Sequence, residues 1–326
     1  MFQRILVPLD GSSLAERALP LAARLARATR GSLLLVRVVS PASEFALYST
    51  ESSLLIQEAR EEDVTRATAY LAQVAQSPDL TDINTRIAVF TGIAASTLLD
   101  VVQAQEIDLM VMCSHGETGF RRWALGSVAQ KVARHSLVPL LVLSANDASP
   151  LRLVAGKTAA VHALVALDGS CEAEAVVEPI AHLVALLSEP FQGVLHLLRV
   201  VDLPEHYGGW KSQAHIDTSL IDHVQHDAET YLALMSERLT VTMSNTHPLT
   251  ITTSVQVHSD VADVILRTAG HRKGGIHQEH AKDTDDLLAL ATHGRSGIAR
   301  WALGSVTERV LGATTLPLLI VRSKKA

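Results

Sequence analysis

The sequence predicts an α/β protein built from two repeated doubly wound domains, each a five-stranded parallel sheet flanked by helices. Short runs of apolar and β-branched residues alternate with longer segments of helical periodicity, and no turn signal joins successive strands as a hairpin. The same short motifs then return in the same order in the second half of the chain. This alternation predicts parallel strands joined by right-handed helical crossovers that cover both faces of each sheet.

The strands of the first half are predicted from their short apolar runs, at Arg4–Leu9, Leu33–Val39, Thr85–Phe90, Leu109–Cys113 and Pro139–Leu143. The later helices are predicted at Glu51–Gln76, Ile93–Gln105 and Ser127–Arg134. The first helix is predicted to begin with a capping box formed by Ser13 and Glu16, whose side chains can satisfy free amides at a helix start. Pro20 lacks an amide hydrogen and predicts a kink in this helix, as Pro179 does in the second half.

The repeat is clearest in the heptapeptide RWALGSV, which occurs at Arg122–Val128 and again, unchanged, at Arg300–Val306. VPLDGS at Val7–Ser12 likewise returns as VALDGS at Val165–Ser170, and LLLVRVVS at Leu33–Ser40 returns as LHLLRVVD at Leu195–Asp202. Ordered self-similarity of this kind indicates two copies of one domain. We expect the first domain to span residues 1–146, a linker rich in small residues 147–160, and the second domain 161–326.

Composition excludes several classes of protein. The formal net charge is −6 and no block of Lys and Arg occurs, so a nucleic-acid interface is not expected. No apolar stretch approaches the length of about 18 residues that a membrane span needs, and the N-terminus lacks the apolar segment of a secretory signal. The two cysteines, Cys113 and Cys171, lie in different halves, which suits a reducing compartment. We therefore expect a cytoplasmic protein without a membrane partner.

Polar residues follow the first and fourth predicted strands, where ligands bind in sheets of this class. Asp10 follows the first strand, and Ser114, His115 and Gly116 follow the fourth. Gly126 and Ser127 then open the last helix, where free backbone amides and the helix dipole attract phosphate. The corresponding residues of the second half are Asp168, Gly294, Arg295, Gly304 and Ser305. This pattern predicts an anion-binding pocket in each half.

On these residues the chain resembles the universal stress protein family, in a tandem arrangement that covers nearly all of both halves. The resemblance implies a sheet order of 3-2-1-4-5 and a stress-response protein that binds ATP or AMP, with or without Mg. It implies nucleoside contacts for Asp10 and Val38, and ribose and phosphate contacts for Gly116, Gly126, Ser127 and Val128. In the second half the implied ligand contacts are Asp168, Val200, Gly294, Gly304, Ser305 and Val306. The first glycine of the family pattern is replaced by Cys113 and Ala291.

Other interpretations stay open at the level of sequence. The fold could serve assembly alone, with one or both nucleotide sites vestigial, and Asp10 and Asp168 could be turn or N-cap residues. His115 and His293 have no nucleophile or paired carboxylate beside them, so a structural hydrogen bond is favoured over catalysis, with slow ATP hydrolysis as the upper limit. An insertion at His271–Asp283 carries three histidines without the fixed spacing of a metal site, so no metal is expected.

Two further expectations concern how the halves relate. The last strands, beginning at Pro139 and Pro317, are apolar and would be exposed edges in a lone domain, which predicts an internal pseudo-dimer paired through them. Family members dimerise through this strand, so a homodimer of the whole chain also stays open. The halves should bind unequally, because Arg295 follows Gly294 where Glu117, a like charge for a phosphate, follows Gly116.

Overall fold

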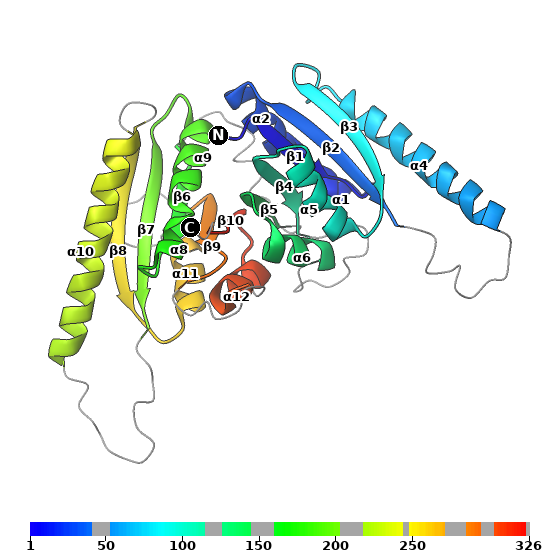
Figure 1. Cartoon of the computed structure of the whole chain (residues 1–326). Coiled ribbons are helices and arrows are strands. Elements are labelled where there is room, and N and C mark those ends of the chain that lie inside the picture. Colours follow the sequence, from blue (N-terminus) through cyan, green and yellow to red (C-terminus); the bar gives the residue numbers. More distant parts are fainter. Residues whose placement is uncertain are drawn as a thin grey trace, which may run out of the picture. The chain divides into compact units, whose positions relative to one another are not determined.

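The computed structural model describes residues 1–40, 53–114, 126–144, 160–202, 218–243, 248–270, 285–294 and 303–323. The chain divides into two compact units, Met1–Val154 and Ala155–Ala326, each described here by itself. Figure 1 shows that both units combine strands with helices packed along them, as expected of an α/β fold. Among the helices in these ranges, none is both long enough and apolar enough to cross a bilayer.

The first unit is a parallel sheet with the strand order β3-β2-β1-β4-β5. Its elements are β1 (Arg4–Pro8), α1 (Ser13–Glu16), α2 (Leu19–Thr29), β2 (Ser32–Val39), α4 (Ser53–Ala75), β3 (Asn84–Thr91), α5 (Ala94–Ala104), β4 (Leu109–Cys113), α6 (Ser127–His135) and β5 (Leu140–Leu143). Every strand pair in this sheet is parallel, and a helix follows each of the first four strands. The predicted fold class and the 3-2-1-4-5 order are confirmed.

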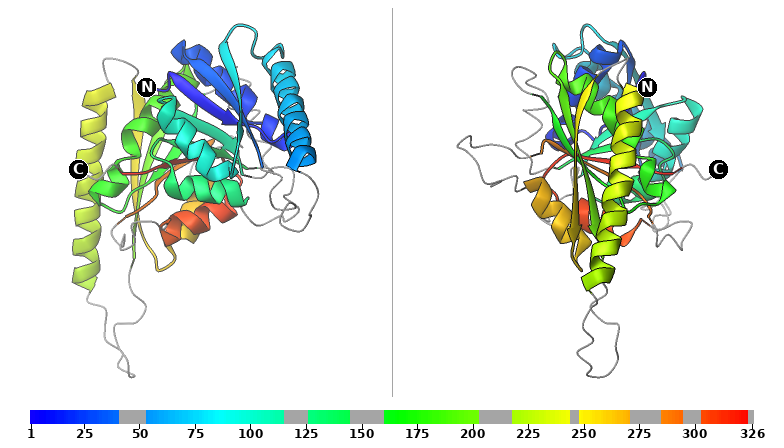
Figure 2. Two further views of the ribbon diagram at one scale, coloured as in Figure 1. Left: turned by 45° about the vertical axis from the view of Figure 1, so that its right-hand side comes forward. Right: turned by 90° about the vertical axis from the view of Figure 1, so that its left-hand side faces the viewer.

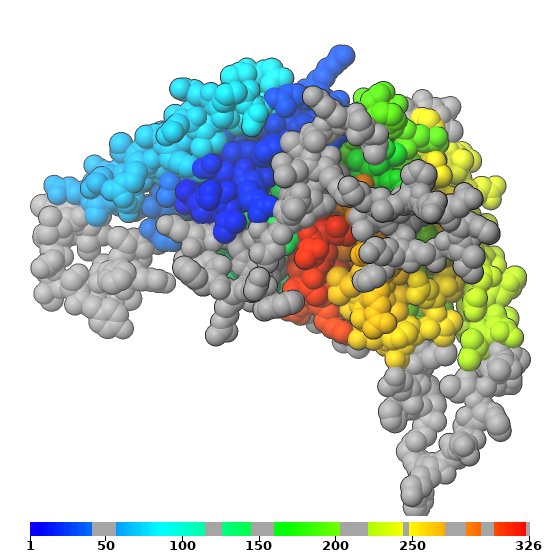
Figure 3. Space-filling view, turned by 180° about the vertical axis from the view of Figure 1, so that it is seen from behind, coloured from blue at the N-terminus to red at the C-terminus, as the bar shows by residue number. Residues whose placement is uncertain are grey.

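The second unit repeats this topology with the order β8-β7-β6-β9-β10, again fully parallel. Its elements are β6 (His162–Ala166), α8 (Cys171–Glu174), α9 (Val177–Ser188), β7 (Gly193–Val201), α10 (Thr218–Met243), β8 (Leu249–Val257), α11 (Val261–Gly270), β9 (Leu287–Ala291), α12 (Ser305–Ala313) and β10 (Leu318–Val321). Helix α10 runs alongside β8 in both views of Figure 2. Figure 3 shows α11 (amber) and α12 (red) next to each other on one face of the second unit, where they pack together.

The core of each unit is the central strand pair, covered on both sides. All residues of β4 and of β9 are buried, and Ile5, Leu6 and Val7 of β1 have no exposed surface. A strand buried on both faces has a continuous apolar sequence, which explains why β1 and β4 could be predicted from the sequence. Because the central strands are apolar, the polar side chains that line the pockets lie at the ends of the strands.

The start of the first helix differs from the prediction, and the capping-box prediction at Ser13 is wrong. The N-cap is Ser12, whose hydroxyl oxygen accepts a hydrogen bond from the Ala15 amide at 3.1 Å. Glu16 does not cap the helix and instead accepts a hydrogen bond from the Tyr70 hydroxyl at 2.8 Å. The reason lies in the preceding turn, which holds Ser12 in an extended conformation (φ −87°, ψ 148°) suited to an N-cap.

The kink predicted at Pro20 is instead a break between two helices. Helix α1 ends at Glu16 and α2 begins at Leu19, with Pro20 in the first turn of α2, where its missing amide leaves no hydrogen bond unmade. The second unit has the same break between α8 and α9, with Pro179 in the first turn of α9. The break lets the short helices α1 and α8 lie at the strand ends.

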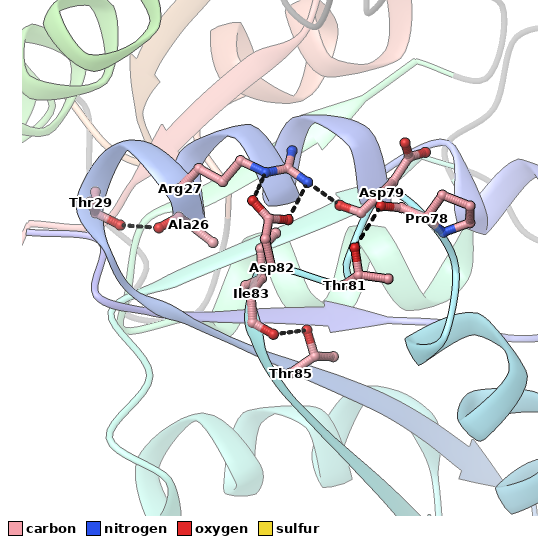
Figure 4. Close-up of polar contacts among 9 residues, drawn as sticks. All are labelled: Ala26, Arg27, Thr29, Pro78, Asp79, Thr81, Asp82, Ile83 and Thr85. Carbon is pink, nitrogen blue, oxygen red and sulfur yellow. Dashed lines mark hydrogen bonds and ion pairs between the residues drawn. The ribbon is translucent and has the colours of Figure 1, made fainter.

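A polar clamp fixes the far end of α2 in the first unit (Figure 4). The Arg27 guanidinium donates to both carboxylate oxygens of Asp82, at 2.7 and 2.8 Å, and also to the backbone carbonyl of Asp79. This hydrogen bonding raises the pKa of Arg27 and lowers the pKa of Asp82. Both side chains are largely exposed, so the clamp orients the turn before β3 more than it stabilises the fold.

Candidate functional site

The turn after the first strand has the same geometry in both units. Oδ1 of Asp10 accepts hydrogen bonds from the Ser12 amide at 2.9 Å and the Ser12 hydroxyl at 2.6 Å. Oδ1 of Asp168 accepts the matching bonds from Ser170 at 2.9 and 2.6 Å. The turn role left open for these aspartates is therefore present, although the N-cap itself is the serine. The carboxylates are held in one orientation at the end of the strand.

Glycine opens the last helix of each unit. Gly126 and Gly304 are the N-caps of α6 and α12, both with φ −58° and ψ 144°, and neither helix start is capped by a side chain. Their own amides donate to the carbonyls of Ser114 and Thr292 at 2.8 Å. The first amides of an α-helix have no partner within the helix and are satisfied by caps, water or ligands. Each helix start is thus suited to an anion.

These features line one pocket in each unit. The pocket of the first unit has a volume of about 160 Å³ and includes the predicted residues Asp10, Val38, Gly126, Ser127 and Val128. The pocket of the second unit has a volume of about 110 Å³ and includes the predicted residues Asp168, Val200, Gly294, Gly304, Ser305 and Val306. The fold thus brings strand ends and helix starts together in both halves. The predicted residues Gly116 and Arg295, together with His115 and Glu117, lie outside the described residues.

The space beside the second aspartate is too small for a side chain unless the aspartate moves. A Cβ atom on Gly294 would lie 2.0 Å from Oδ2 of Asp168, far inside van der Waals contact. Gly304 is also constrained, because a Cβ there would lie 3.0 Å from the carbonyl oxygen of Thr292. The chain segments that follow β6 and β9, which are neighbouring strands, therefore approach each other closely, with the Asp168 carboxylate between them.

Part of the pocket wall comes from apolar residues that have no distinguishing feature in the sequence. Ala94 and Leu98 of α5, and Val261 and Ile265 of α11, line the pockets from the helix that follows the third strand of each unit. Ala15 and Ala173 add small apolar surfaces from α1 and α8. The chain order could have indicated this helix, because it starts at the same edge of the sheet. These apolar walls face the polar turn and suit a flat ring.

The two residues that replace the first glycine end the fourth strands and are buried. Burial raises the pKa of the Cys113 thiol to about 12, and its sulfur lies 3.9 Å from the carbonyl oxygen of Ala15. A thiol that stays protonated at neutral pH is a weak nucleophile, so Cys113 acts as a small wall residue. His293 lies at the pocket with Nδ1 3.0 Å from the Thr292 hydroxyl, a local hydrogen bond of the kind favoured above.

Within the described ranges, no group of three His, Cys, Asp or Glu side chains is arranged to hold a metal ion. The insertion with His271, His277, Glu279 and His280 lies outside those ranges.

Comparison with known proteins gives a consistent result for both halves. The chain matches the universal stress protein family over residues 1–144 and again over 162–322. It is 27% identical over 143 residues to a universal stress protein of Methanocaldococcus jannaschii, which covers 44% of this chain and 82% of that protein. A universal stress protein of Bacillus subtilis is 27% identical over 152 residues, 44% of this chain and 99% of its own length. The solved structure of an Archaeoglobus fulgidus universal stress protein covers 99% of both chains with a TM-score of 0.63 at 16% identity, a likeness of fold.

Proposed function

Because the chain belongs to the universal stress protein family, with one domain in each half, we propose that each half binds an adenine nucleotide, ATP or AMP. The observation that carries the proposal is that each pocket combines three features: a helix start without a side-chain cap, an aspartate fixed by the turn, and an apolar wall. A nucleotide carries the complementary groups: phosphates for the helix amides, and a sugar and base for the aspartate and the wall.

The phosphates would lie at the starts of α6 and α12. The amides and hydroxyls of Ser127 and Ser305 are donors there, and the helix dipole favours negative charge. Mg²⁺ would reach the site with the phosphates, as it usually binds through phosphate oxygens and water. Gly116, Val128, Gly294 and Val306 complete the proposed cradle, and Arg295 would add a cation in the second half.

The nucleoside would lie between the turn and the apolar wall. Asp10 and Asp168 are positioned to accept a hydrogen bond from a ribose hydroxyl or from the exocyclic amine of adenine. Val38 and Val200 line the same pockets on the neighbouring strand and would pack against the base. The proposed role is that of a cytoplasmic stress-response protein that binds nucleotide, with slow ATP hydrolysis as the upper limit of any catalysis.

A second candidate is an assembly protein of the same fold. The Cys113 and Ala291 side chains at the pocket edge favour it, because they occupy the place of the first glycine in the family pattern. The pairing of the two halves through their last strands, and of two chains with each other, stays a prediction under either candidate. It is checked by expressing the first domain alone, which should aggregate or dimerise rather than remain a soluble monomer.

Heating the purified protein separates the two candidates. Adenine nucleotide released into the supernatant, identified by absorbance and mass, supports binding, and the Gly126→Val/Gly304→Val double variant should release none. Added ATP should also raise the melting temperature and change the fluorescence of Trp123 and Trp301, with adenosine much weaker because it lacks phosphate. If no nucleotide is released and added ATP changes neither the melting temperature nor the fluorescence, nucleotide binding is contradicted and the assembly role is favoured.

A further inference from the structure

An arginine lies directly beneath the Asp-Gly-Ser turn of each unit. Arg37 precedes Val38 on β2, and because side chains alternate along a strand it points away from the pocket that Val38 lines. A Cβ built on Gly11 would lie 3.1, 3.2 and 3.3 Å from Nη1, Nη2 and Cζ of Arg37. Near-equal distances to three atoms of one plane place the flat face of the guanidinium against Gly11.

The second unit repeats this contact. A Cβ on Gly169 would lie 3.1 Å from Cζ and Nη2 of Arg199 and 3.2 Å from Nη1. Gly11 and Gly169 have positive φ values of 95° and 84°, so glycine is favoured at the turn both for its backbone conformation and for the arginine packed against it.

A tyrosine and a glutamate complete the arrangement. The guanidinium carbon of Arg37 lies 5.2 Å from the ring centre of Tyr70, and that of Arg199 lies 5.2 Å from the ring centre of Tyr231, within cation–π range. The tyrosine hydroxyls donate to Glu16 at 2.8 Å and to Glu174 at 3.2 Å. We call each set, Arg37–Tyr70–Glu16 and Arg199–Tyr231–Glu174, an arginine brace.

The arginine and the pocket aspartate of each unit both act on the tyrosine of the brace. Burial and the hydrogen bond to Glu16 raise the pKa of Tyr70, the charge of Asp10 raises it further, and the charge of Arg37 lowers it. Tyr231 responds in the same way to Glu174, Arg199 and Asp168. The aspartate and the arginine of each unit are therefore close enough to act on one phenol.

Packing alone does not account for this choice of residue. Arg199 is only 8% exposed, and a cation is costly to bury unless other groups compensate its charge. An aliphatic side chain would fill the same strand position without that cost. A planar cation instead packs against the glycine of the turn, and a positive charge beneath the turn favours a carboxylate on it.

We propose that Arg37 and Arg199 are positioning residues, each holding its Asp-Gly-Ser turn so that the aspartate carboxylate meets the ligand in one orientation. The inference rests on the proposed function, because it concerns how the aspartate recognises a nucleoside. It predicts that loss of the brace removes discrimination at the nucleoside end while the phosphate contacts of the helix start remain.

The experiment uses the full chain with Gly126→Val, so that only the second site binds. Calorimetry is run with ATP, with inosine triphosphate, which lacks the exocyclic amine, and with 2′,3′-dideoxy-ATP, which lacks the ribose hydroxyls. In the parent chain, the analogue that lacks the group contacted by Asp168 should bind more weakly than ATP. In Arg199→Met the affinity for ATP should fall about tenfold while that analogue keeps its affinity. The ratio of the affinity for ATP to the affinity for the analogue should therefore fall to about one.

Matched variants separate a positioning role of the arginine from a general loss of stability in the unit. Asp168→Asn should collapse the same ratio, and Arg199→Lys should not restore it, because an ammonium has no flat face to support the turn. Arg267→Met removes an exposed cation of the same unit, which pairs with Asp263 at 2.6 Å and is not a member of the brace, and should leave the ratio unchanged. If Arg199→Met does not fold, Arg37→Met in the Gly304→Val background tests the less buried brace.

Equal weakening of all three nucleotides, or no change, would overturn the inference while leaving the proposed function in place. A parent chain that binds none of the three nucleotides would overturn the proposed function and this inference together. The two failures are therefore distinguishable within one set of titrations.

Discussion

The pockets of the two halves share one polar framework but differ in their walls. The hydrogen bonds of the turn have the same lengths in both units, and the N-cap glycines have the same φ and ψ. The walls differ at equivalent positions, where Ala94, Ser114 and Ala129 of the first unit correspond to Val261, Thr292 and Thr307 of the second. The larger side chains accompany the smaller pocket, about 110 against 160 Å³.

The aspartate and serine of the turn and the glycine and serine of the helix start are the same residue types in both units, whereas the wall residues differ. The residue after Gly116 or Gly294 also differs, Glu117 in the first half and Arg295 in the second. Thr307 also adds a tie that Ala129 cannot make, since its hydroxyl donates to the Ala291 carbonyl at 2.8 Å and joins α12 to the end of β9. This hydrogen bond holds the helix start of the second unit to its strand end, and the first unit has no hydroxyl at that position.

The largest difference between the halves should be in thiol reactivity. Cys113 is buried, with the pKa of its thiol raised to about 12, whereas Cys171 is exposed. Because only the thiolate reacts, Cys113 should stay protected at pH 8 by several orders of magnitude in rate. Iodoacetamide labelling followed by peptide mass spectrometry should modify Cys171 alone until urea is added. Equal labelling of both residues in the folded protein would contradict the wall role of Cys113.

A methyl group at Gly294 should damage the second site most among small changes. In Gly294→Ala the new Cβ would displace the Asp168 carboxylate, and ATP affinity at that site should fall tenfold or more, on the order of one charge-assisted hydrogen bond. Gly312→Ala is the matched control in the same unit, because a Cβ there meets nothing within 4 Å. Calorimetry that finds the two variants alike would argue against close contact between the strand ends.

The hydrogen bond between Thr307 and the Ala291 carbonyl should contribute measurably to the free energy of unfolding of the second unit. Thr307 is only 5% exposed, so Thr307→Ala should lower the free energy of unfolding of that unit by about 1 kcal/mol, the usual worth of a buried hydrogen bond. Thr230→Ala removes a similar bond, to the His226 carbonyl at 2.9 Å, from an exposed position on α10 and should cost less. Urea denaturation of the three proteins compares them, and an equal or larger loss in Thr230→Ala would contradict the tie.

Much of this fold could be predicted because each strand is a buried apolar run. The predicted strand at Leu109–Cys113 agrees with β4, the prediction for β3 is one residue short at both ends, and the other three differ by one residue at one end. The start of the first helix could not be placed, since Ser12 and Ser13 are alike in sequence and only the Asp10 turn selects Ser12.

Site residues could be predicted only where a polar residue or a glycine interrupts an apolar segment. Asp10 and Gly126 are conspicuous at the ends of apolar segments, whereas Ala94 and Leu98 have no feature that marks them as pocket wall. The braces could not be predicted either, because Tyr70 packs on Arg37 from one helix and bonds to Glu16 on another, and their spacing along the chain carries no signal. Contacts set by tertiary packing leave little trace in local sequence.

The central claim is that one chain carries two adenine-nucleotide sites on a common framework, with the second site tighter. Calorimetric titration of ATP into the parent chain, Gly126→Val and Gly304→Val tests it most directly. We predict binding of two nucleotides to the parent chain, and a loss of affinity at least several-fold greater in Gly304→Val than in Gly126→Val, because Glu117 disfavours phosphate where Arg295 favours it. Equal losses, a greater loss in Gly126→Val, or no heat of binding in the parent chain would contradict the claim.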